Sequence, residues 1–230
     1  MRKIGVICAM KKEADRVAEA MTDRRTEEKG GFSFTLGRIG EKEVVLGLSG
    51  AGKVSAALCT QAMIFFYGVE AVLNSGVAGS LSRDCGVFDI ALSTALVQHD
   101  MDTTAIGDPM GLLSGLGLVE LPGDPELLRT AEEAARDLGL KTVAGVIATG
   151  DQFVAGRAQK EKILAHFPAV ACEMEGAAVA YAAYINRVPV LVIRAISDAF
   201  DGRNEVDYAA FAPRAAETGA RLLIETVQRV

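Results

Sequence analysis

The sequence is poor in the residues that build zinc sites and disulfide frameworks, with two histidines and four cysteines among 230 residues. The cysteines are Cys8, Cys59, Cys85 and Cys172. They lie far apart in mostly apolar surroundings, and they form neither a CxxC pair nor a Cys/His pattern with the spacing of zinc ligands. Buried, reduced thiols are therefore the expected state, which favours a cytoplasmic location.

The chain also lacks a long hydrophobic run and a cluster of basic residues. The longest apolar stretch, 177–193, is interrupted by Asn186, Arg187 and Pro189, whereas a membrane-spanning helix needs about 20 apolar residues. The apolar run near the N-terminus reaches the charged cluster 11–13 too soon for a signal peptide. A formal net charge of −6 with scattered cations disfavours nucleic acid and anionic membranes as partners. We expect a soluble protein whose partner is a small molecule.

Short aliphatic runs alternate with helical patterns, which is typical of an α/β domain. We expect strands at residues 3–8, 32–38, 43–49, 71–75, 90–97, 142–148 and 188–196. We expect helices at residues 53–66, 125–138, 177–186 and 208–228. One helix has clear boundaries, with Asp124 as its cap, Pro125 at its first position and Gly139 after its end. Because half of its residues are hydrophobic, the chain 1–230 is predicted to fold as one domain.

One predicted strand ends in a concentration of polar groups. The apolar residues 189–193 lead directly into Arg194, Ser197 and Asp198. Buried parallel strands read as continuous aliphatic runs, and the ligands of α/β proteins bind outside their carboxyl ends. The segment therefore predicts an active site, with a surface ion pair between Arg194 and Asp198 as the alternative.

Acidic or aromatic side chains also lie next to the ends of three other strands. Glu173 and Glu175 stand at the entry to an alanine-rich helix, and an extended chain would turn both carboxylates to the same side. Interaction with the helix dipole is the alternative role for this pair. Phe153 follows a strand either as cover for the core or as a platform for a planar ligand. Glu13 follows the first strand, so acidic and aromatic groups are predicted to gather at one edge of the sheet.

Two further patterns look like ligand sites but fit them poorly. The GAGK sequence at residues 50–53 lacks the GxxxxGK[ST] spacing of a nucleoside triphosphate site. His99 lies near Asp100 and Asp102, but one histidine beside carboxylates is weak support for a transition-metal site. We expect neither a triphosphate nor a metal ion, and we expect a loop or interface role for residues 99–102.

Six segments, in this order, form a pattern more specific than any one of them. They are KIGVI (3–7), SGAGKV (49–54), NSGVAG (74–79), TGDQF (149–153), EME (173–175) and RAISD (194–198). The pattern resembles the 5′-methylthioadenosine/S-adenosylhomocysteine nucleosidases of the purine nucleoside phosphorylase superfamily, and it covers nearly the whole chain. The resemblance implies a twisted mixed sheet closing toward a barrel and flanked by helices, in a homodimer whose partner chain covers part of the pocket.

The same resemblance implies an activity and its catalytic residues. The reaction is hydrolysis of the N-ribosidic bond of 5′-methylthioadenosine, S-adenosylhomocysteine and related 5′-substituted adenosines, with release of adenine, in methionine salvage and without a cofactor. Such cleavage passes through an oxocarbenium-like sugar, which calls for an acid at the purine, a base for water and an anion near the ring. By the family pattern, Asp198 would protonate or hydrogen-bond adenine N7, and Glu13 would take the proton from the attacking water. Glu175 would hold the ribose hydroxyls, and Arg194 would orient Glu13 and the water.

The resemblance also implies substrate contacts. Phe153 would pack against the purine, and Val154 would present its backbone N–H and C=O to the adenine edge. Met174 would lie against the sugar and Met10 near the 5′ substituent, with core packing as an equal alternative for both methionines. Ser197 would hydrogen-bond near the purine or cap the end of its strand.

Some positions depart from the family pattern and leave the preferred 5′ substituent open. Val77 stands where the family commonly has a serine, and Ala51 replaces a larger aliphatic residue. The segment 106–117 differs from the aromatic-rich loop that often borders the 5′ pocket. Tyr208 stands where the family often has phenylalanine, and it is expected to line the same pocket.

Three alternatives remain open. A purine nucleoside phosphorylase would use the same base and sugar contacts, but phosphate needs cations, and the first loop brings Glu13 beside Lys11 and Lys12. A futalosine-type nucleosidase would use the same chemistry as the leading hypothesis. A purine nucleoside-binding protein without turnover would not need both Glu13 and Asp198.

Overall fold

Strands and helices alternate along most of the chain. The computed structural model describes residues 1–201 and 204–230, and the side chains of all of these except residues 204–208. The strands are β1 (Lys3–Cys8), β2 (Thr22–Lys29), β3 (Phe32–Ile39), β4 (Lys42–Leu48), β5 (Ala71–Ser80), β6 (Ile90–Gln98), β7 (Leu121–Pro122), β8 (Thr142–Thr149), β9 (Ala169–Glu173) and β10 (Val190–Asp198). The helices are α1 (Lys11–Glu19), α2 (Lys53–Tyr67), α3 (Pro125–Asp137), α4 (Arg157–Leu164), α5 (Gly176–Ile185) and α6 (Asn204–Arg229), with a short 3-10 helix at Thr104–Ile106.

The described strands form one mixed sheet that closes on itself. Its order is β10-β6-β8-β9-β5-β1-β4-β3-β2, with β7 on β6. β10 also pairs with β5, so β5, β10, β6, β8 and β9 make a closed ring from which β1, β4, β3 and β2 extend. β1, β4, β5 and β10 run parallel, whereas β6 runs antiparallel to β10. The predicted mixed sheet closing toward a barrel is confirmed.

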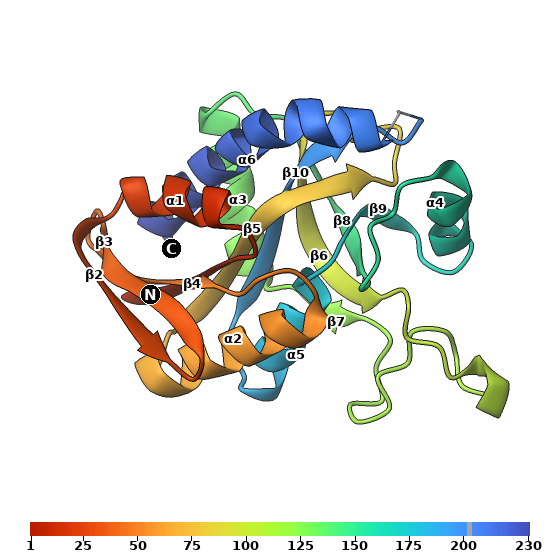
Figure 1. Ribbon diagram of the computed structural model, residues 1–230, viewed down its shortest axis with the longest axis horizontal. Helices are drawn as coiled ribbons and strands as arrows, with labels where there is room; N and C mark the ends of the chain where they lie inside the picture. Colours follow the sequence, from red (N-terminus) through yellow and green to blue (C-terminus); the bar gives the residue numbers. More distant parts are fainter. Residues whose placement is uncertain (202–203) are drawn as a thin grey trace.

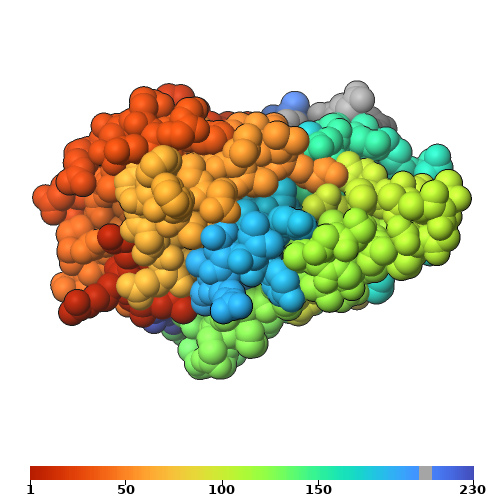
Figure 2. All heavy atoms as spheres, turned by 90° about the horizontal axis from the view of Figure 1, so that it is seen from below, coloured from red at the N-terminus to blue at the C-terminus, as the bar shows by residue number. Residues whose placement is uncertain are grey.

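Helices lie on two sides of this sheet (Figure 1). α1, α3 and α6 pack together on one side, and α2 packs against α5 on the other. α4 lies at the end of the molecule, beside β8 and β9. Figure 2 shows α2, α5 and the segment 100–120 side by side on one face of the surface.

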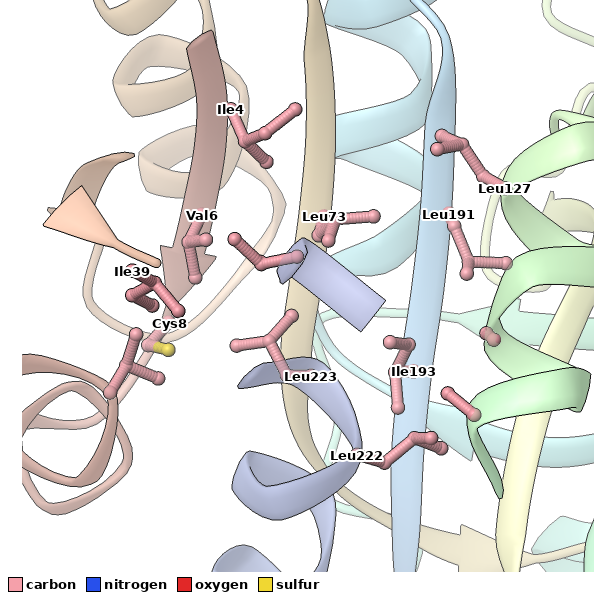
Figure 3. Packing of buried hydrophobic residues seen from close by; sticks show 14 of the residues in the cluster. Ile4, Val6, Cys8, Ile39, Leu73, Leu127, Leu191, Ile193, Leu222 and Leu223 are labelled. Carbon is pink, nitrogen blue, oxygen red and sulfur yellow. The ribbon is translucent and has the colours of Figure 1, made fainter. Parts of the chain in front are cut away.

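The hydrophobic core is divided between the two helical layers. In Figure 3, aliphatic side chains from β1, β5 and β10 face those of α3 and α6, including Leu73, Leu191, Ile193, Leu222 and Leu223. A second cluster joins the opposite face of the sheet to α2 and α5. Each fully buried aliphatic side chain contributes roughly 1.5–3 kcal/mol, so both layers hold the central strands firmly in place.

Every predicted strand and helix forms, and most of their ends lie within two residues of the predicted ones. β5 is the main exception, because it continues past Ser75 to Ser80 while paired with β10 as far as Gly79 and Asp198. α3 begins as predicted, since Asp124 Oδ1 accepts the backbone N–H groups of Glu126 (3.0 Å) and Leu127 (2.9 Å).

Six elements of the described residues were not predicted: α1, α4, β2, β7, β9 and the 3-10 helix at Thr104–Ile106. β2 shows why, because its sequence TDRRTEEK is almost entirely exposed and carries no apolar alternation that could mark a strand.

The four cysteines are buried and free, as predicted. Burial raises the pKa of Cys59, Cys85 and Cys172 to about 12 in each case, so these thiols stay protonated at neutral pH. Among the helices of the described residues, none combines the length and the hydropathy needed to cross a membrane.

Candidate active site

The carboxyl ends of several strands open into one pocket. β1, β5 and β10 run parallel and adjacent, so their ends meet, and β9 reaches the same place through its pairing with the end of β5. The pocket encloses about 680 Å³ including its open mouth. The described residues that line it are Ala9, Met10, Glu13, Ala51, Val77, Ala78, Gly79, Gln152, Phe153, Val154, Cys172, Glu173, Met174, Glu175, Arg194, Ser197 and Asp198.

Glu13 is buried at the first turn of α1, next to the end of β1. Its Oε2 accepts the backbone N–H of Met10 (3.0 Å), which satisfies a donor at the helix start and fixes the carboxylate at the pocket wall. Burial raises the pKa of Glu13, and the Met10 N–H, the Arg194 charge and the backbone of Val77 partly offset the rise. This carboxylate therefore holds protons more strongly than an exposed glutamate does.

Arg194 is the centre of a buried polar network, with only 1% of its surface exposed. Its Nε donates to Glu173 Oε2 (3.1 Å), and its Nη2 donates to Asn74 Oδ1 (2.6 Å) and to Glu175 Oε2 (3.5 Å). Its Nη2 also makes a short contact with Glu173 Oε2. Charged partners on two sides offset the cost of burying the guanidinium.

Arg194 and Glu13 meet over the backbone of Gly76. A Cβ at position 76 would lie 2.3 Å from Arg194 Nη1 and 3.3 Å from Glu13 Oε1, so only glycine fits there. Within the described part of the chain, the hydrogen bonds of Arg194 go to Glu173, Glu175 and Asn74 rather than to Glu13. Arg194 thus acts on Glu13 through its charge, at close range but without a direct bond.

Glu173 and Glu175 make different contacts. The Oε2 of Glu173 accepts the backbone N–H groups of Glu175 (3.0 Å) and Gly176 (2.7 Å) at the start of α5, and its Oε1 accepts the Thr149 hydroxyl. Glu173 therefore serves the helix terminus that the sequence offered as the alternative role for the pair, and it also lines the pocket. From the residues alone the two were an equivalent pair, and only the resemblance to the family assigned Glu175 to the ribose.

Glu175 faces the pocket with a strongly perturbed carboxyl group. Its Oε1 accepts the backbone N–H of Gly52 (2.9 Å), and its Oε2 lies 3.5 Å from Arg194 Nη2. Burial, followed by the neighbouring charge of Glu173, raises the pKa of Glu175 from 4.5 to about 7. Near neutral pH this group is therefore divided between its acid and its carboxylate form.

Asp198 is buried at the very end of β10. Its Oδ2 lies 3.1 Å from Lys160 Nζ, and its Oδ1 lies 3.3 Å from Ser197 Oγ. A Cβ at Gly79 would lie 2.9 Å from Asp198 Oδ2, so the backbone of β5 approaches this carboxyl group closely. Lys160 was not predicted from the sequence.

The predicted substrate contacts gather at the same pocket. Seven of the eight line it: Met10, Ala51, Val77, Phe153, Val154, Met174 and Ser197. Tyr208, the eighth, lies among the side chains outside the described residues. Sequence reasoning missed Gln152 and Cys172, which adjoin predicted residues in the TGDQF and EME segments and could have been found as their neighbours.

The segment 106–117 contributes no residue to the lining within the described part of the chain. It lies instead on the face that α2 and α5 share (Figure 2).

The GAGK loop and the His99 region form a polar cluster of their own. Lys53 Nζ pairs with Asp100 Oδ1 (2.6 Å) and Gln98 Oε1 (3.2 Å), and the Lys53 backbone N–H donates to Asp151 Oδ1 (2.8 Å). Lys53 is therefore held by side chains of the protein, which agrees with rejecting a triphosphate loop. No group of His, Cys, Asp and Glu among the described residues has the arrangement of a metal site.

Comparisons with known proteins agree with this geometry. Residues 3–228 match the model of the phosphorylase superfamily. A 5′-methylthioadenosine/S-adenosylhomocysteine nucleosidase of Shewanella loihica is 35% identical, over 99% of this chain and 100% of that protein. An aminodeoxyfutalosine nucleosidase of Helicobacter pylori is 37% identical over the whole of both chains.

Solved structures of both kinds of nucleosidase are also similar to this chain. The 5′-methylthioadenosine/S-adenosylhomocysteine nucleosidase of Neisseria meningitidis, in complex with methylthio-immucillin-A, has a TM-score of 0.96 and 33% identity over the whole of both chains. The native futalosine hydrolase of Helicobacter pylori has a TM-score of 0.95 and 36% identity, over 100% of this chain and 98% of that one.

Proposed function

This chain belongs to the phosphorylase superfamily, within its group of adenine nucleosidases, and from that premise we propose that it hydrolyses 5′-methylthioadenosine, S-adenosylhomocysteine and related 5′-substituted adenosines to adenine and the free sugar. One observation carries the proposal: Glu13, Glu175 and Asp198, from three distant parts of the chain, are buried around a single pocket.

Asp198 serves the leaving group. Asp198 takes up a proton from solvent when the substrate binds, this proton passes to N7 of adenine as the C1′–N9 bond breaks, and the electron pair of that bond goes to the purine. The sugar is left with oxocarbenium character. The end of β10 suits this role because Ser197, Lys160 and the Gly79 backbone surround the carboxyl group and hold it in place.

Glu13 and Glu175 serve the sugar side. Glu13, whose pKa is raised by burial, takes a proton from the water that attacks C1′. Glu175 accepts hydrogen bonds from the ribose hydroxyls, which stabilises positive charge as it develops on the ring. Arg194 holds Glu175 by a direct contact and biases Glu13 through its charge.

The base and the 5′ group are held mainly by apolar surface. Phe153 lines the pocket and is 47% exposed, and its planar ring is the surface on which the purine stacks. The backbone of Val154 reads the adenine edge. Met174 contacts the sugar and Met10 the 5′ substituent, while Val77 lies near the ribose without a hydroxyl to offer it, and the small Ala51 leaves room near the ligand; all four line the pocket.

The charges of the lining favour water over phosphate as the nucleophile. Arg194 is the lone cation among the described lining residues, and it is already engaged by Glu173 and Glu175. A phosphate dianion would enter a pocket with four carboxyl groups. Phosphorolysis is therefore disfavoured.

A second candidate substrate is aminodeoxyfutalosine. Relatives named for this substrate are as similar to the chain as those named for 5′-methylthioadenosine, at 34–37% identity for both groups taken together. Both candidates use the same three carboxyl groups, so they differ only in what the 5′ end of the pocket accepts.

We also propose a homodimer formed through the face shown in Figure 2. Val54 and Leu58 of α2 lie one helical turn apart and are 70% and 57% exposed, and Ile106 of the neighbouring segment is also exposed. Val54 and Leu58 lie on one helix, and large exposed apolar side chains of this kind are typical of an interface. Light scattering should give twice the chain mass, and Leu58→Glu should shift it to the monomer; a wild-type monomer would refute the dimer.

The function is tested by a substrate panel assayed with and without phosphate. We expect adenine release from 5′-methylthioadenosine and adenosylhomocysteine at a rate that phosphate leaves unchanged. Preferred turnover of aminodeoxyfutalosine would select the second candidate. Phosphate-dependent formation of ribose 1-phosphates would establish a phosphorylase, and binding of adenosines without turnover would establish a binding protein.

A further inference from the structure

Lys160 is a fully buried lysine in a position where a helix normally carries an aliphatic residue. It lies on the inward face of α4 with Ile163, and none of its surface is exposed. A buried ammonium group is costly unless anions and hydrogen-bond acceptors surround it. Its place in the fold therefore needs an explanation beyond filling space.

The contacts of Lys160 lead directly to the proposed catalytic acid. Its Nζ lies 3.1 Å from Asp198 Oδ2 and donates to the backbone carbonyl of Ala199 (2.8 Å). Asp198 lies 38 residues further along the chain and is itself buried. The lysine thus holds one carboxylate oxygen and the first residue after β10 at the same time, which restricts rotation of the Asp198 carboxyl group.

We propose that Lys160 is a positioning residue for Asp198 that holds its carboxyl group toward the leaving purine and stabilises the carboxylate that proton transfer leaves behind. The inference rests on the proposed function. When the proton moves from Asp198 to N7 and the C1′–N9 bond breaks, Asp198 becomes a carboxylate in a buried site. The Lys160 ammonium stabilises that negative charge as it forms, so its effect appears in the transition state rather than in substrate binding.

The alternative is that Lys160 only ties α4 to the end of β10. Both roles use the same contacts, but they differ in how strongly the fall in rate on removing Lys160 depends on the leaving group. A purine needs a proton to leave, whereas p-nitrophenol leaves as a stable anion. If Lys160 positions the acid, its removal slows only the reaction of the purine substrate. If Lys160 is only a structural tie, its removal slows the reactions of both substrates equally.

The experiment compares Lys160→Met with Lys162→Met, the same change at an exposed position of the same helix. For 5′-methylthioadenosine we expect Lys160→Met to lower kcat by about tenfold or more, with a smaller change in KM. For the 5′-methylthioriboside of p-nitrophenol we expect a change of less than about twofold, as for Asp198→Asn. Lys160→Arg should recover most of the lost rate, and Lys162→Met should match the wild type on both substrates.

A double-variant cycle tests the link to Asp198. In the Asp198→Asn background, Lys160→Met should cost less than about twofold in kcat, because the acid it supports is already absent. This double variant leaves no unpaired buried charge at the two positions, so it also covers the case in which Lys160→Met alone fails to fold.

Three results would overturn the inference: no loss in Lys160→Met, equal losses on the two leaving groups, or a full additional loss in the double variant. Failure of the proposed function is seen separately, as absence of adenine release by the unmodified protein.

Discussion

Replacing Glu175 with glutamine should stabilise the folded protein at neutral pH while it slows turnover. The carboxyl group of Glu175 is buried, and it lies near Glu173 and Glu13. Each of these features disfavours its charged form, so ionisation of Glu175 destabilises the folded protein. Glutamine has nearly the same shape and carries no charge.

The magnitude follows from the pKa of Glu175. Folding raises this pKa from 4.5 to about 7, so between these two pH values the folded state keeps a proton that the unfolded chain has lost. The free energy of unfolding therefore falls as pH rises through this window and stays constant above it. A shift of this size corresponds to a loss of about 3 kcal/mol. Glu175→Gln abolishes this loss, although its amide group pairs less well with Arg194.

The assay is urea unfolding of the wild type, Glu175→Gln and Glu41→Gln between pH 4.5 and 8. Glu41 is exposed in the turn between β3 and β4, so its variant controls for the general loss of a carboxylate. The stability gap between Glu175→Gln and the wild type should widen by about 2–3 kcal/mol up to pH 7 and then level off. Parallel curves for all three proteins would refute a protonated, buried Glu175.

Further outcomes follow from the same geometry. Asp198→Asn and Glu13→Gln should each lower kcat about 100-fold or more while calorimetry still detects adenine nucleoside binding; an unchanged kcat would contradict the assigned role. Gly79→Ala places a Cβ 2.9 Å from Asp198 Oδ2, so kcat should fall about tenfold or more with little change in Tm; a normal rate would show that the carboxyl group need not stay where it is. The four buried cysteines should resist a thiol reagent at neutral pH and all react in urea; rapid labelling of the native protein would disprove their burial.

Much of the site could be predicted because its residues follow aliphatic strands. Arg194 and Asp198 end β10, and Glu13 and Phe153 follow β1 and β8, so each is marked by the apolar run before it. In a sheet with parallel neighbours, such ends meet at one edge, which makes their gathering a consequence of topology.

The pairing of these residues could not be predicted in the same way. Lys160 lies on a short charged helix, and its partner Asp198 is 38 residues away, so nothing local distinguishes it from the exposed lysine two positions later. The sequence paired Arg194 with Glu13 or Asp198, whereas in the folded chain its guanidinium contacts Glu173 and Glu175. Such choices depend on distances between segments, which a sequence pattern does not contain.

β2 has a consequence for how this protein behaves in a crowded solution. It is the last strand at the open end of the sheet path, and a bare strand of this kind can recruit the same strand of another copy. Six of its eight residues in TDRRTEEK are charged, so a second copy would have to strip water from many ions to pair there. One edge of the sheet therefore stays unpaired, and its charges oppose aggregation into fibres.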